Sequence, residues 1–107
     1  MLIVTTDTVS GQNITETLGL VRGATVRAKH VGTDIVASLK MLVGGELTGY
    51  SSLLAGAREQ AIERMIDDAT ARGANAIVCM RMQTSAISKG SSEIVAYGTA
   101  VRLANAG

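Results

Sequence analysis

The sequence contains no phenylalanine and no tryptophan, and its only aromatic residues are Tyr50 and Tyr97. A hydrophobic core must therefore be built from aliphatic side chains and methionine, each of which buries less apolar area than an aromatic ring. Hydrophobic residues nevertheless occupy 47% of the 107 positions. We infer that part of this apolar surface is buried between subunits, and we expect a homo-oligomer.

Thiol and imidazole groups are equally scarce, since the chain has one cysteine, Cys79, and one histidine, His30. A single cysteine cannot form an internal disulfide. Soft transition metals are held by three or four thiolate and imidazole ligands, which one subunit cannot supply. Symmetry in a ring could gather copies of His30 or Cys79, so both are metal candidates, although a cysteine in an apolar strand usually packs as a small hydrophobe. We predict no resident cofactor, with metal binding left open.

Strong charge and long apolar runs are also missing. The net charge is +1 and the charged residues are interspersed, so no basic stripe indicates a nucleic-acid partner. The longest apolar run, Ala76 to Met80, is far shorter than the ~20 residues of a membrane span. The first residues also lack the pattern of a signal peptide. We therefore expect a cytoplasmic protein that contacts no membrane.

One stretch has clear helical periodicity. Its apolar residues recur at steps of three and four, which places them on one helix face; they are Leu54, Ala57, Ala61, Ile62, Met65, Ile66 and Ala69. Gly73 follows the last of them and predicts the end of the helix, since glycine readily adopts a left-handed conformation. At the other end, Thr48 and Ser51 are both candidate caps. The pairs Arg64/Asp68 and Asp68/Arg72 are spaced to attract each other on the solvated face.

The flanking segments predict strands. Residues 2–6 are rich in β-branched residues, and 14–26 indicate extended structure with a turn or bulge around 21–24. Residues 76–84 and 93–103 predict an antiparallel hairpin joined by a polar loop over 85–92. A short second helix is predicted over 34–43.

These elements predict one domain, residues 1–107, of the α+β class: two layers, with an antiparallel sheet and one long helix. The last strand has apolar residues on both of its faces. We therefore expect the sheet face opposite the long helix to be covered as well, either by the short helix or by a neighbouring subunit.

The sequence offers little for catalysis. The serine pairs at 51–52 and 91–92 have no histidine nearby, and Glu63, Asp67 and Asp68 are typical of an exposed helix face. The glycines do not follow dinucleotide or phosphate-loop spacing. We therefore predict that the protein is not an enzyme.

A second group of candidate residues surrounds a double glycine at the start of the long helix. These residues are Asp34, Gly44, Gly45, Glu46, Tyr50 and Arg58. They can line either a subunit interface or a small-ligand pocket. We favour an interface, because tyrosine and arginine are enriched where subunits meet.

Several short motifs together resemble the YbjQ-like family of small bacterial and archaeal proteins. They are Asp34-Ile35 with Ala37-Ser38, Gly44-Gly45-Glu46, Tyr50, Ala57-Arg58, Ala61, Gly73-Ala74-Asn75-Ala76 and Tyr97-Gly98-Thr99-Ala100-Val101. The resemblance spans nearly the whole chain. It implies a dodecin-like β-α-β-β subunit that assembles into a homopentameric ring, in a family labelled heavy-metal-binding but without an established activity.

We therefore expect a non-enzymatic, oligomeric binding or scaffold protein in the form of a homopentameric ring. The alternative is a protein that binds a heavy metal or a small ligand, at the ring axis or in a pocket between subunits.

Overall fold

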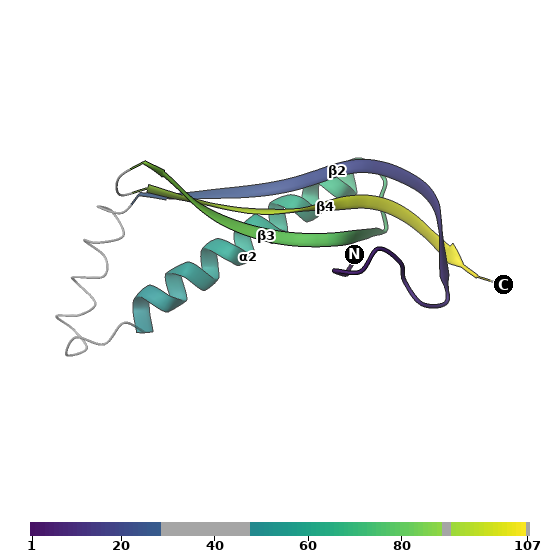
Figure 1. The fold of residues 1–107 in the computed structure, drawn as a ribbon, viewed down its shortest axis with the longest axis horizontal. Helices are drawn as coiled ribbons and strands as arrows, with labels where there is room; N and C mark the ends of the chain where they lie inside the picture. The colour runs from purple at the N-terminus through teal and green to yellow at the C-terminus, as the bar shows by residue number, and fades with distance from the viewer. Residues whose placement is uncertain (29–47, 89–90, 107) are drawn as a thin grey trace.

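The structure of the chain, a computed structural model, describes residues 1–28, 48–88 and 91–106. Its elements are β1 (Leu2–Ile3), β2 (Gln12–Ala28), α2 (Thr48–Ala71), β3 (Ala76–Ser88) and β4 (Ser91–Asn105). The α2 helix runs obliquely across one face of a long, curved sheet (Figure 1). The α+β class and the one long helix are thus confirmed within the described residues. The helix predicted over 34–43 lies outside them.

The sheet has the strand order β1-β3-β4-β2. The three long strands are antiparallel, but β1 pairs in parallel with the start of β3, Leu2 opposite Ala76 and Ile3 opposite Ile77. The expectation of an antiparallel sheet was therefore wrong in one strand, and the sheet is mixed. The physical reason is that the N-terminal segment hydrogen-bonds to the outer edge of β3, where Val4 donates to Ile77 and accepts from Met80.

The β3–β4 hairpin is longer than the sequence predicted. Ser85, Ala86 and Ser88 pair with Glu93, Ser92 and Ser91. The polar loop predicted over 85–92 was therefore wrong, since most of it is strand. Backbone hydrogen bonds hold this end of the ladder, and they do not require apolar side chains.

The end of α2 confirms the predicted helix stop at Gly73. This glycine has a φ of 81° and donates its N–H to Thr70, while Ala74 donates to Ala69. These two bonds form a Schellman motif, which satisfies carbonyls at the end of the helix. Asn75 then exchanges two side-chain hydrogen bonds with the Leu103 backbone, of 3.0 and 2.8 Å.

At its other end, α2 begins at Thr48, so Ser51 lies inside the helix and cannot be its cap.

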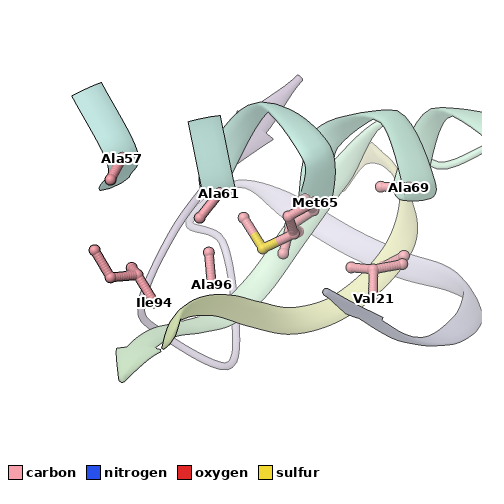
Figure 2. Packing of buried hydrophobic residues seen from close by; sticks show 9 residues of the cluster. Val21, Ala57, Ala61, Met65, Ala69, Ile94 and Ala96 are labelled. Carbon is pink, nitrogen blue, oxygen red and sulfur yellow. The ribbon is translucent and has the colours of Figure 1, made fainter. Parts of the chain in front are cut away.

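The main core lies between α2 and the sheet (Figure 2). The helix contributes a row of small side chains around one large one, and the three long strands contribute the opposing layer. The buried residues are Val21, Ala57, Ala61, Met65, Ala69, Ile77, Ile94, Ala96 and Ala100. Alanines let the helix backbone come close to the strands, which suits a chain without bulky aromatic core residues.

Gly23 marks the closest approach of α2 to β2. A Cβ atom at this position would lie 2.1 Å from the Ala61 carbonyl oxygen and 2.4 Å from the Met65 nitrogen. The predicted bulge around 21–24 was wrong, because residues 21–24 pair one-to-one with 98–95. The register shifts instead lie between Ile14 and Glu16 and between Thr17 and Gly19. Gly23 is thus needed for close packing rather than for a bend.

The face opposite α2, called here the back face, is covered along one part. Val4 and Val9 of the N-terminal segment, together with Cys79, pack against a second buried cluster on this face. Its members are Ala76, Val78, Val101 and Leu103. Within the described residues, the cover is therefore the N-terminal segment, an occupant that the sequence did not predict.

We expect Gly23→Ala to lower the free energy of unfolding by at least about 2 kcal/mol, because the new methyl group meets helix backbone that must move. Gly56→Ala is the matched control. Gly56 lies on α2, the helix that Gly23 of β2 contacts, but has open space around its Cβ position, so the substitution should raise stability by about 0.5–1 kcal/mol. Urea denaturation measures both values. Equal effects of the two substitutions would contradict the close approach at Gly23.

Candidate functional site

Cys79, one of the two metal candidates, lies in an irregular part of β3. Val78 pairs with Thr99 and Arg81 with Tyr97, so Cys79 and Met80 together face Gly98 in a β-bulge. Cys79 has a φ of 56°, and it is half-buried against the apolar cluster of the back face. A Cβ at Gly98 would lie 2.7 Å from Ile77 Cγ2, so glycine permits this irregularity. Cys79 thus has a packing role in the subunit.

The described residues do not form a metal site within one chain. Across 1–28, 48–88 and 91–106, no group of three His, Cys, Asp or Glu side chains could hold an ion. His30 lies outside these residues. One half-buried thiol is not a donor set that fits a soft metal.

The candidates around the double glycine fall largely outside the described residues. This applies to Asp34, Gly44, Gly45 and Glu46. Tyr50 lies in the first turn of α2, and Arg58 lies about two turns later with an exposed side chain. The structure therefore places Arg58 on the outside of the subunit, whereas the predicted grouping of all six residues stays a prediction.

Two arginines of α2 cover the outer edge of β2. Arg64 donates through Nη1 to the Ala24 carbonyl, and Arg72 donates through Nη1 to the Leu18 carbonyl at 3.2 Å. These carbonyls lie on an edge strand and would otherwise be open to pairing with another chain. The helix thus covers part of one edge of its own sheet with cationic side chains.

Asp68, which lies between these arginines on the helix, completes the cover. Its carboxylate accepts from the Arg22 backbone N–H at 3.3 Å and forms an ion pair with Arg72 Nε at 3.3 Å. The four-residue spacing of these charges predicts attraction on a solvated helix face. Only the Asp68/Arg72 pair is confirmed, because Arg64 turns to the strand. The spacing of charges along a helix does not indicate that these side chains contact a strand, because β2 is distant in the sequence.

Among the described residues, nothing covers the opposite edge of the sheet in this way beyond Met80. Backbone hydrogen bonds join the N-terminal segment to β3 only as far as Cys79 and Met80, and the Arg81 side chain adds a bond to the Thr5 carbonyl at 2.9 Å. From Arg81 to Ser88, no described residue pairs with the outer backbone groups of β3. Met82, beside this edge, is 37% exposed. The two edges of the sheet therefore differ, one covered by charged side chains and one open.

In the part of the chain that the structure describes, the back face is also open beyond the N-terminal segment. Here Arg22, Tyr97 and Arg81 are direct neighbours across β2, β4 and β3. On β2, Leu20 and Val26 lie on either side of this row and are 59% and 53% exposed. We call this region the open back face; its residues are Leu20, Arg22, Val26, Arg81, Val95 and Tyr97. Apolar side chains around a tyrosine and two arginines are typical of a protein interface.

Comparison with known proteins places the chain in a family. The YbjQ family model, whose description reads "Putative heavy-metal-binding", matches residues 1–104. The chain belongs to the YbjQ family. Relatives at more than half identity support this placement: a UPF0145 protein of Clostridioides difficile is 58% identical, covering 96% of this chain and 92% of the relative. A UPF0145 protein of Methanosarcina acetivorans is 54% identical and covers 98% and 99%.

A solved structure supports the fold of this YbjQ family member. A crystal structure of a protein of unknown function from the DUF74 family of Pediococcus pentosaceus matches with a TM-score of 0.64. The match covers 97% of this chain and 98% of that one, at 14% identity. It shows a shared fold. In addition, no helix among the described residues is long and apolar enough to cross a membrane.

We expect Asp68→Ala to lower the free energy of unfolding by about 1 kcal/mol, because the Arg22 N–H and Arg72 each lose an acceptor. The uncovered β2 edge should also increase light scattering on heating. Glu16→Ala, which removes an exposed carboxylate elsewhere on β2, is the control and should leave both values near wild type. If both variants behave alike, Asp68 does not protect the edge.

Proposed function

We propose that this YbjQ family member is a non-enzymatic binding or scaffold protein that acts as a homo-oligomeric ring. The observation that carries the proposal is the open back face, where Leu20 and Val26 leave more than half of their side chains exposed. Full burial of an aliphatic side chain of this size contributes about 1.5–3 kcal/mol relative to exposure. Covering this face with another subunit would therefore stabilise the protein substantially.

The open edge of β3 gives further support to self-association. An edge strand with no charged or helical cover offers unpaired N–H and C=O groups to which another strand can add. The outer groups of Arg81 to Ser88 are such an edge within the described residues. A subunit with one covered and one open sheet edge presents two different surfaces to its neighbours. Contacts between different surfaces are head-to-tail, and such contacts can close into a ring.

The five-fold, dodecin-like form of the ring rests on the family resemblance. A cytoplasmic location belongs to the same proposal, since the charge balance and the single cysteine are ordinary for that compartment. The proposed absence of catalysis rests on the lack of paired acid, base or nucleophile groups in the sequence.

Native mass spectrometry of protein purified without chelator tests the assembly and any bound mass together. We expect a single species of five subunits at micromolar concentration, without additional mass. A monomer at that concentration would contradict self-association. A single species with another number of subunits would agree with a ring and would correct its proposed five-fold symmetry.

Metal binding is the second candidate function, and the description of the family model favours it. Because the described part of one chain holds no cluster of ligands, such a site needs copies of the same residue from several subunits. Cys79 and His30 are the residues that could contribute in this way.

We expect Cys79→Ser to leave the zinc and copper stoichiometry of the wild-type protein unchanged, because the thiol packs against an apolar cluster. Metal content per subunit, measured after dialysis against each ion, checks this, and His30→Ala is measured in parallel. A metal content that falls in either variant would favour the metal-binding function and identify the ligand.

A further inference from the structure

Three residues of β3 beyond Met80 turn their backbone groups out of the sheet. The N–H and C=O groups of successive residues in an antiparallel strand point to opposite sides. On β2, the Ala24 carbonyl points away from β4, because it accepts from Arg64 of α2. Ala24 lies opposite Val95, whose own groups therefore point to the other neighbour, β3, where Val95 lies opposite Gln83. The residues that alternate with Gln83 and point outward are Met82, Thr84 and Ala86.

The hydrogen bonds of the N-terminal segment agree with this alternation. Val78 lies opposite Thr99 of β4. The two neighbours of Val78 turn outward, since Ile77 accepts from the N-terminal segment and Cys79 donates to it. Further along β3, no described residue bonds to the backbone of the three outward residues. Their donors and acceptors are thus available to another strand.

This stretch of β3 also lacks the features that protect strand edges. Natural edges are commonly protected by charged side chains or proline, or are covered by a helix. None of residues 82–86 is charged or proline, and the three outward residues are exposed. The α2 helix packs mainly against β2 and, less extensively, against β4. Within the described residues, neither chemistry nor the helix keeps another strand away from this edge.

The surface of a second copy that matches this edge best is the same edge. Its β2 edge is occupied, because α2 side chains bond there to three backbone groups. Two β3 strands that pair antiparallel about a two-fold axis can place Thr84 opposite its own copy and Met82 opposite Ala86. In this register each outward N–H and C=O group meets a complementary group. A shift by two residues brings Ala86 opposite Met80, whose N–H is already bonded to Val4.

We propose that the β3 edges of two copies pair antiparallel about a two-fold axis centred on Thr84. The two Thr84 side chains then form a threonine pair, which is a favourable cross-strand neighbour. Met82, which is 37% exposed in one subunit, gains cover beside the small Ala86 of the other. Residues 82–86 bring no like charges together.

This contact goes beyond the proposed ring. It joins identical surfaces, so it pairs two copies and does not continue around a ring. In the proposed assembly it links a subunit of one ring to a subunit of another, and the open back face remains for the contact between neighbours within a ring. The paired stretches are short and bury far less than the ~1,200 Å² of stable complexes. The link therefore forms at concentrations well above micromolar.

Cysteine cross-linking tests this register. In a Cys79→Ser background, one variant carries Gln83→Cys and a second carries Ser85→Cys. The proposed pairing places position 83 of one copy opposite position 85 of the other, with Cα atoms about 4.5 Å apart, a distance that a disulfide can bridge. Identical positions lie about 7–8 Å apart, which is too far. After oxidation with diamide at submillimolar protein concentration, an equimolar mixture should yield about fivefold more disulfide dimer than either variant alone. Intact mass spectrometry identifies the mixed dimer, because the two substitutions differ in mass.

A proline at the axis provides the second arm of the test. Thr84→Pro, added to both cysteine variants, removes an outward N–H without removing a bond to β4, and it should reduce the mixed dimer to the level of the single variants. Thr84→Ala keeps the N–H and is the matched control, so it should leave the yield of mixed dimer unchanged. Circular dichroism checks that each variant is folded.

A mixed dimer that is no more abundant than the dimers of identical variants would overturn the contact, and so would a yield that Thr84→Pro leaves unchanged. Native mass spectrometry of the wild-type protein at micromolar concentration tests the ring separately. A ring whose variants give no excess of mixed dimer would overturn only the edge contact. An excess of mixed dimer in a protein that is monomeric at micromolar concentration would overturn only the ring.

Discussion

The close contact between α2 and β2 at Gly23 is the constraint on which the rest of the subunit depends. The missing side chain at Gly23 and the alanines of the helix let the two backbones approach, so a core without aromatic rings can still be densely packed. The same contact fixes the position of the helix across the strands. It brings Arg64, Asp68 and Arg72 to the β2 edge.

This placement makes the subunit asymmetric. The helix covers one sheet face and protects one edge, while the N-terminal segment covers only part of the back face. Among the described residues, nothing covers the outer edge of β3 from Arg81 to Ser88 or the part of the back face around Leu20 and Val26.

Some residues that carry the family resemblance have a clear role in the fold. In the segment 73–76, Gly73 adopts the left-handed conformation that ends α2, and Asn75 ties the following turn to Leu103 of β4. Gly98 permits the bulge at Cys79. These positions are explained by packing and backbone conformation without a ligand.

The sequence by itself determined the long helix, its end at Gly73 and the strands on either side, because these follow from local periodicity and from glycine conformation. It also indicated the two faces of β4, through strict alternation. It did not determine that β1 is parallel to β3, or that Arg64 and Asp68 face an edge strand. Nor could it show that Gly23 serves close packing, or that the N-terminal segment covers part of the back face. Those features join residues far apart in the chain, and only the tertiary structure decides which backbone groups and surfaces meet.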